Sequence, residues 1–437
     1  MNARLRKLYD DLSDTFWLLP ALLVLLGSVA AFGLIEVDRS GAVPAWLMEN
    51  WLYNGGATGA RTLLGAVASS TIGVAGTVFS ITIAALSLAA GQMGPRLLRN
   101  FTRDRGNQMT LGIFLGTFCY ALIVLRSVRT ADEGAFVPHL ALGVGIVLAF
   151  VCVATLVYFV DHMAGRINVD TVIGLVGDDI RNMMRSLAAE GPQPAPPPAN
   201  HWRDAEAICE QRQGYLQHLD ENGLAAWARE QEVEIRLLVR PGDYIFPGAP
   251  IALILPPREG AAEAIRDATA LAPHLTSSND LRFAIRQLVE VAVRALSPGI
   301  NDPHTAISVL NRLGAVLCEM QQIRLQSGVW VMQGRSVLVV PHVQYDELVD
   351  AMLHMIRQNA AGKPSVLIGI VVVLTQVASV ERDPPRLSSL RKHAALAMQD
   401  GERDVASPDD LADLRDRYQA FIEVVEHGPL ARFRHEL

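Results

Sequence analysis

The hydrophobic residues of this chain are concentrated in four long segments that lie before residue 162. These segments contain no Asp, Glu, Lys, Arg or His, and they cover residues 16–35, 63–91, 109–125 and 140–160. A helix needs about 20 apolar residues to cross the hydrocarbon core of a bilayer. We therefore expect four transmembrane helices within residues 1–161. The second segment is longer than one crossing requires, so its helix must tilt, bend or protrude.

Basic residues beside these segments predict their orientation, because Lys and Arg are retained on the cytoplasmic side of a membrane. The main basic clusters are Arg4, Arg6 and Lys7 before the first segment and Arg96, Arg99, Arg103 and Arg105 after the second. We therefore expect both termini in the cytoplasm. A cleaved signal peptide is the alternative interpretation of the first segment, but its apolar run exceeds the roughly 7–15 residues usual for such a peptide.

Small residues recur at every third or fourth position along the second segment. They are Ser69, Gly73, Gly76, Ser80, Ala84 and Ser87. At helical spacing these residues form one stripe. Small residues let neighbouring helices approach closely, which drives packing in lipid. Alternatively, the stripe lines a narrow water-filled pore, in which hydroxyl groups replace part of the hydration shell of an ion.

Three arginines follow this segment at three- and four-residue spacing, namely Arg96, Arg99 and Arg103. Repeated around an oligomer, they would form a collar at the cytoplasmic mouth that concentrates anions. The alternative is that they bind lipid phosphates and enforce the topology. The segments themselves contain no ionisable residue of the kind that proton relays and many ion-coupled carriers need. The sequence therefore favours passive permeation or anchoring over coupled transport.

The remaining residues predict a mixed α+β cytoplasmic domain. Residues 162–200 are predicted to form a helix followed by a linker. The linker is indicated by the five prolines within residues 191–198. Short strand patterns separated by turns indicate a small β-rich module over residues 201–260. Helical periodicity dominates residues 261–437. The apolar run 365–380 is short for a crossing, so we expect a buried helix there, with a fifth span as the alternative.

The turn between two predicted helices carries a cluster of polar residues. They are Asn301, Asp302, His304 and Thr305. In the structural interpretation, Asp302 caps the second helix and Pro303 occupies its first position. In the functional interpretation, the four residues form a polar nest at a helix N-terminus that binds an anion or a partner loop.

Composition narrows the classes of function. The chain is 50% hydrophobic and 19% charged, with a mean hydropathy of +0.24, which agrees with a chain partly embedded in lipid. A net charge of −7 argues against a nucleic-acid partner. The four cysteines and the histidines show no metal-binding spacing, and no Walker A motif or nucleophile elbow occurs. We therefore expect no metal, no cofactor and no enzymatic activity.

Two resemblances add to this picture. Residues 239–252 are similar to the hammerhead hairpin of biotinyl and lipoyl carriers, but they lack the carrier lysine, which leaves a structural β module. The motifs Phe79-Ser80, Gln92–Phe101, Leu115–Phe118, Gly214–Gln217 and Ala295–Pro303 together resemble a family of bacterial membrane proteins catalogued as domain of unknown function twenty-two fifty-four. That resemblance implies the bacterial cell membrane and supplies no activity. One departure is Gly94, where we expect serine before the Pro-Arg pair.

These observations lead to one principal hypothesis and two rivals. The principal hypothesis is a homo-oligomeric passive ion channel of the inner membrane, with the second span lining the pore and the cytoplasmic domain gating it. The first rival is a membrane-anchored sensor or scaffold whose spans pack against one another without forming a pore. A membrane enzyme is the second rival. The lipid bilayer, a second copy of the chain and a permeating ion are the expected partners.

Overall fold

The computed structural model describes residues 16–41, 56–94, 104–129, 136–189, 191–273 and 281–429. The chain divides into two compact units. The membrane unit comprises residues 10–91 and 95–168, and the C-terminal unit comprises residues 169–437 together with 92–94.

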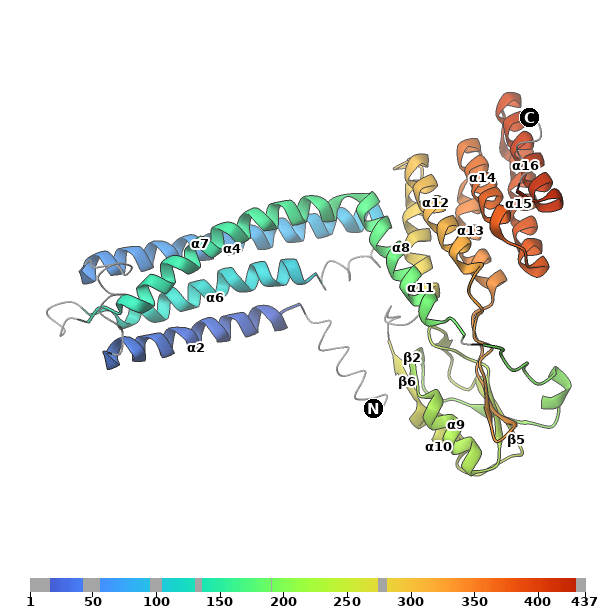
Figure 1. The fold of residues 1–437 in the computed structure, drawn as a ribbon, viewed down its shortest axis with the longest axis horizontal. Helices are drawn as coiled ribbons and strands as arrows, with labels where there is room; N and C mark the ends of the chain where they lie inside the picture. Colours follow the sequence, from blue (N-terminus) through green and yellow to red (C-terminus); the bar gives the residue numbers. More distant parts are fainter. Residues whose placement is uncertain are drawn as a thin grey trace. The chain divides into compact units, whose positions relative to one another are not determined.

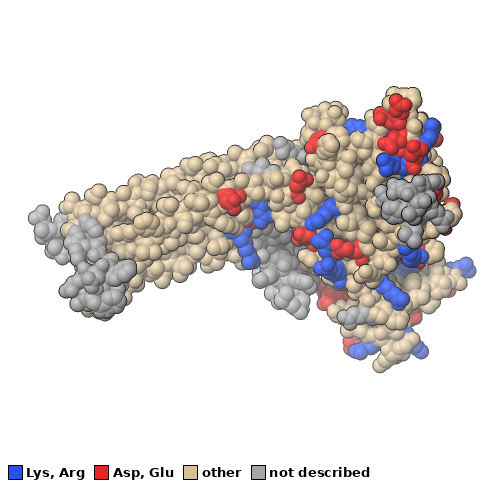
Figure 2. Space-filling view, turned by 45° about the horizontal axis from the view of Figure 1, so that its top comes forward, with Lys and Arg blue, Asp and Glu red and all other residues tan. Residues whose placement is uncertain are grey.

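Four long apolar helices form the membrane unit and run side by side (Figure 1). They are α2 (Leu18–Ser40), α4 (Ala57–Met93), α6 (Arg105–Ser127) and α7 (His139–Ile167). Each is long and apolar enough to cross a membrane, so the prediction of four transmembrane helices is confirmed. Figure 2 shows that Lys, Arg, Asp and Glu are rare on the visible surface of these helices and frequent on that of the C-terminal unit. The 37 residues of α4 make a helix of roughly 55 Å at about 1.5 Å per residue.

The helices α2 and α6 are in backbone contact at glycine residues. A Cβ atom at Gly27 would lie 2.7 Å from the carbonyl oxygen of Gly116, and one at Gly116 would lie 2.9 Å from that of Leu23. Both distances are shorter than real Cβ atoms adopt. Gly112 and Gly116 are four residues apart on α6, which is the small-residue spacing that lets membrane helices approach closely. This pair of helices therefore depends on having no side chain at the contact.

One end of the membrane unit is fixed by the carboxylate of Asp38, near the C-terminus of α2. Its two oxygens accept hydrogen bonds from the amides of Leu140 and Ala141, at 3.1 and 2.9 Å. These amides lie in the first turn of α7, where N–H groups have no partner within the helix. The Tyr120 hydroxyl of α6 donates to the carbonyl of Ala141 at 2.7 Å. The N-terminus of α7 is thus bound to both neighbouring helices.

The other end of α7 is fixed by Asp104, whose side chain is only 2% exposed. One carboxylate oxygen accepts the amide of Gly106 and so caps α6. The second oxygen lies 2.8 Å from His162 Nε2 and 3.0 Å from Arg166 Nε. The fourth span was expected to end at residue 160, but α7 continues to Ile167. Residues four positions apart share one helix face, so this extra turn brings both side chains to Asp104.

The C-terminal unit contains two β-sheets. Its strands are β1 (Glu206–Cys209), β2 (Gly214–Leu219), β3 (Glu234–Leu237), β4 (Tyr244–Ile245), β5 (Pro250–Leu255), β6 (Thr269–Ala272), β7 (Val329–Met332) and β8 (Arg335–Val339). The five-stranded sheet has the order β1-β5-β3-β8-β7, and the three-stranded sheet has the order β4-β2-β6. Only the β3–β8 pair is parallel among these described strands.

The β-rich part is therefore not confined to residues 201–260, because β6, β7 and β8 come from later in the chain. The strands β7 and β8 pair as an antiparallel hairpin. Gln333 and Gly334 form its two-residue turn with φ angles of 52° and 77°, which suits the right-handed twist of the flanking strands. The core between the sheets and helices α9 (Glu221–Glu230) and α10 (Ala261–Ala268) contains Leu216, Leu224, Ile235, Ile254, Ile265 and Leu338.

Helices make up the rest of the C-terminal unit. They are α8 (Val169–Ser186), α11 (Leu281–Ala295), α12 (Pro303–Met320), α13 (Tyr345–Asn359), α14 (Pro364–Val380), α15 (Pro384–Asp404) and α16 (Pro408–His427), and a short 3-10 helix, η3, covers Ala199–Trp202. The apolar helix α14 lies against α12, α15 and α16, and Val366, Ile370 and Leu374 are fully buried there. A buried helix, rather than a fifth span, therefore accounts for the apolar run that ends at Val380.

We predict that Asp38→Ala destabilises the membrane unit. The substitution leaves two amides of the first turn of α7 without their acceptor, and loss of such a cap costs about 0.5–2 kcal/mol. Thermal unfolding of the purified protein in detergent measures the change. Glu36→Ala is the control, because that side chain on the same helix end is 75% exposed and should contribute little. Equal effects of both substitutions would contradict the capping role.

Candidate functional site

The packed face of α4 and its small-residue stripe lie on opposite sides of the helix. The buried residues of α4 are Ala60, Leu64, Ala68, Thr71, Ala75, Val78, Ala85 and Ala89. The predicted stripe of Ser69, Gly73, Gly76, Ser80, Ala84 and Ser87 is exposed at every position. Each residue turns an α-helix by about 100°, so the two sets are centred roughly 180° apart. The structure therefore places all six stripe residues on the face that the described part of the chain leaves exposed.

Glycines on α4 and α6 are used differently. The glycines Gly112 and Gly116 of α6 are in close contact with α2. By contrast, a Cβ atom at Gly73 or Gly76 of α4 would meet no other atom within 4 Å. Within the described residues, the small side chains of this stripe therefore serve no contact of the chain with itself.

Bulky apolar residues border the stripe on both sides. Helical spacing places Ile72 and Ile83 along one border and Ile81 and Leu88 along the other. All four side chains are exposed, by between 40% and 49%. Small residues between two rows of large ones form a shallow groove, and such a groove accepts the ridge of another helix.

The hydroxyl groups of α4 are bonded to the backbone of their own helix. Ser80 donates to the carbonyl of Gly76 at 2.9 Å, and Thr77 donates to that of Gly73 at 3.2 Å. Each hydroxyl proton therefore has an acceptor without water, as a helix in lipid requires. Each hydroxyl oxygen also keeps lone pairs that a cation or a neighbouring copy could contact. The geometry suits both dry packing and a wet pore.

The other residues predicted near α4 lie at its end. Arg96, Arg99 and Arg103 fall outside the described residues. Gly94 lies inside them and has a φ angle of 106°, which residues with a Cβ atom rarely adopt. A residue with a side chain at this position would therefore be strained.

The polar turn before α12 is occupied by its own hydrogen bonds. The carboxylate of Asp302 accepts the amide of Thr305 at 3.1 Å and its hydroxyl at 2.6 Å, and these bonds lower the pKa of Asp302 below its ordinary value. Pro303 begins the helix. Asn301 has a φ angle of 49°, and only Asn301 and His304 of the four predicted residues are exposed. The expected N-cap is therefore present at Asp302.

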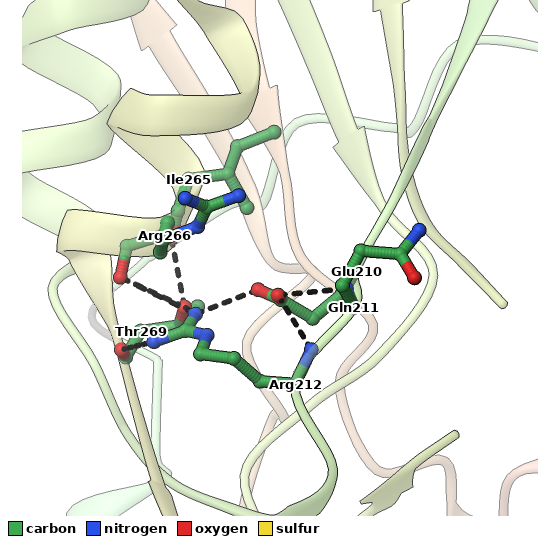
Figure 3. Close-up of polar contacts among 6 residues, drawn as sticks. All are labelled: Glu210, Gln211, Arg212, Ile265, Arg266 and Thr269. Carbon is green, nitrogen blue, oxygen red and sulfur yellow. Dashed lines mark hydrogen bonds and ion pairs between the residues drawn. The ribbon is translucent and has the colours of Figure 1, made fainter. Parts of the chain in front are cut away.

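A polar network that the sequence did not indicate joins the residues after β1 to the end of α10 and the first residue of β6. Figure 3 shows the Arg212 guanidinium lying between Glu210 and Thr269. Glu210 Oε1 accepts the amides of Gln211 and Arg212, both at 2.9 Å. Burial acts to raise the pKa of Glu210, but the bonds from Arg212 and Gln211 lower it below its ordinary value. The network fixes the fold locally, and the described residues contain no cluster suited to a metal.

We predict that Asp302→Ala lowers the stability of the C-terminal unit by about 1 kcal/mol, the usual cost of a lost helix cap. His304→Ala should leave it unchanged, because that side chain is exposed and makes no hydrogen bond within the described residues. Hydrogen–deuterium exchange of the first turn of α12 measures both effects. An equal or larger loss of protection in the His304 variant would contradict the assignment of the cap to Asp302.

Comparison with known proteins places the chain among relatives whose function is also unknown. An uncharacterized protein of Mycobacterium tuberculosis (strain CDC 1551 / Oshkosh) is 31% identical over 452 residues, which cover 99% of this chain and 85% of the relative. An uncharacterized protein of Mycobacterium bovis has the same identity and coverage. No solved structure matches the chain. The family model described as predicted membrane protein (DUF2254) matches residues 13–376. The chain therefore belongs to this family of membrane proteins.

Proposed function

We propose that the protein is a homo-oligomeric passive ion channel of the bacterial inner membrane, in which α4 of each copy lines the pore. The uncovered small-residue face of α4 carries this proposal. The helix uses its opposite face for α6 and α7, and a Cβ atom at Gly73 or Gly76 of its free face would meet no described atom within 4 Å. Copies that meet at this face would surround an axis lined by small and hydroxyl-bearing residues.

Assembly through α4 follows from the forces that operate in lipid. Lipid tails are as apolar as leucine, so helices associate through close packing rather than through the hydrophobic effect. A groove of small residues packs poorly against disordered lipid chains and well against another helix. The four uncharged runs of the spans contain no Asp, Glu, Lys, Arg or His, which favours passive permeation over coupled transport.

The proposed orientation places both termini and the C-terminal unit in the cytoplasm. The basic residues before the first span and after α4 support this orientation. The C-terminal unit would then gate the pore or form its vestibule. The rival function is a membrane-anchored scaffold in which the free face of α4 packs against another helix without forming a pore. The hydroxyl groups of α4 that donate to their own helix backbone are compatible with this function.

Thiol modification in liposomes distinguishes a pore from dry packing. We predict that Ser80→Cys reacts with a water-soluble methanethiosulfonate and that the reaction removes most of the salt flux. Val78→Cys should neither react nor change the flux, because Val78 is 2% exposed and packs against α7. Both variants carry Cys209→Ser, which removes the exposed native cysteine, and the parent with this change reports any reaction elsewhere.

Two results would contradict the proposal. The wild-type protein could fail to conduct any salt in liposomes, which would leave the scaffold as the function. Alternatively, the protein could conduct salt while Ser80→Cys stays unreactive and fully active, which would place the pathway away from α4.

A further inference from the structure

The C-terminal unit contains a cavity of about 410 Å³. Its wall combines α8, the segment from β2 into α9, and the chain that follows β8. Leu187 and Val343 contribute apolar surface, and Gln217, Glu221, Arg240 and His342 contribute polar groups. This volume lies within the range of cavities that hold small organic molecules, roughly 300–1,000 Å³, and their walls are usually mostly apolar with a few convergent polar groups.

Among the polar residues of this cavity, Gln217 has the least evident structural role. It ends the motif Gly214–Gln217, in which the other residues have structural roles. Gly214 has a φ of 138° and lies against the carbonyl of Ala272, and Leu216 is buried in the core. The side-chain oxygen of Gln217 is buried and accepts no hydrogen bond from any described residue. A buried acceptor without a partner is costly, which points to a donor supplied from outside the chain.

The charges of the cavity favour a cationic donor. One oxygen of Glu221 accepts the indole N–H of Trp330 at 3.1 Å, but within the described ranges no Lys or Arg forms an ion pair with Glu221. The guanidinium of Arg240 is held by Glu347 at 2.5 Å. Burial lowers the pKa of His342, while the nearby Glu221 carboxylate acts to raise it, and the neutral form of its imidazole can accept a hydrogen bond. The cavity thus offers a carboxylate that forms no ion pair with a described Lys or Arg, together with two neutral acceptors.

We propose that this cavity binds a small molecule with a primary ammonium group on an apolar body. The ammonium group donates to the Gln217 oxygen and pairs with the Glu221 carboxylate, and the apolar body lies against the wall around Leu187 and Val343. An amine and an apolar amino acid share this chemistry. The site belongs to the C-terminal unit alone and is independent of the proposed pore.

Binding is tested by isothermal titration of the full-length protein in detergent with three matched probes. These are phenethylamine, L-phenylalanine and 3-phenylpropionate, which share the apolar body and differ in the charged group. Saturable binding of phenethylamine alone identifies an amine site, and binding of L-phenylalanine identifies an amino-acid site. Binding of 3-phenylpropionate as tightly as the others, or of no probe, overturns the proposal.

Variants locate the binding. Glu221→Gln and Gln217→Leu should each lower the affinity for the bound probe by about tenfold or more, as expected for loss of a charged or buried hydrogen bond. Gln217→Leu should leave the melting temperature of the free protein unchanged or raised, because it removes an unpaired buried oxygen, so lost binding cannot be ascribed to misfolding. Glu263→Gln is the control, since Glu263 is an exposed acid in the first turn of the neighbouring helix α10. Unchanged affinity in both cavity variants places the binding elsewhere and overturns the proposal.

Discussion

Two carboxylates, the buried Asp104 and the half-buried Asp38, determine how the helices of the membrane unit are held together. Asp38 binds the first turn of α7, and Asp104 binds His162 and Arg166 near its last turn. Charged groups are costly in hydrocarbon, so such contacts are placed at helix ends. Between the two ends, α2 and α6 need only approach closely enough for backbone contact at Gly27 and Gly116.

In this arrangement one face of α4 packs against α6 and α7, and the opposite face is exposed. Among the described residues, the glycines Gly112 and Gly116 of α6 lie in a helix contact, whereas the small-residue stripe of α4 is exposed. This stripe is presented outward between rows of isoleucine and leucine. A helix built in this way is suited to contact with a second copy, and the pore proposal adds that the contact surrounds water. The ligand cavity is a separate feature of the C-terminal unit, so either proposal can stand without the other.

Much of the fold could be predicted from the sequence, because local patterns determine it. Uncharged runs located the four spans, and Asp302 and Pro303 located the start of α12. The C-terminal end of α7 was missed because charged residues after an apolar run usually mark the membrane–water boundary. The sequence does not show that Asp104 binds these side chains. The cavity was missed for a related reason. Gln217, Arg240 and His342 are far apart in sequence, and no periodicity records that their strands and loops meet. The four-residue strands β1 and β6 carry too short a pattern to be recognised.

The mass of the assembled protein tests the central claim most directly. Native mass spectrometry of the purified protein measures the number of copies in the wild type and in two leucine variants. Gly76→Leu fills the free face of α4 and should release monomers, whereas Ala154→Leu, on an exposed position of α7, should leave the oligomer intact. A monomeric wild type, or an oligomer that survives Gly76→Leu unchanged, would contradict the claim that copies meet through the small-residue face of α4.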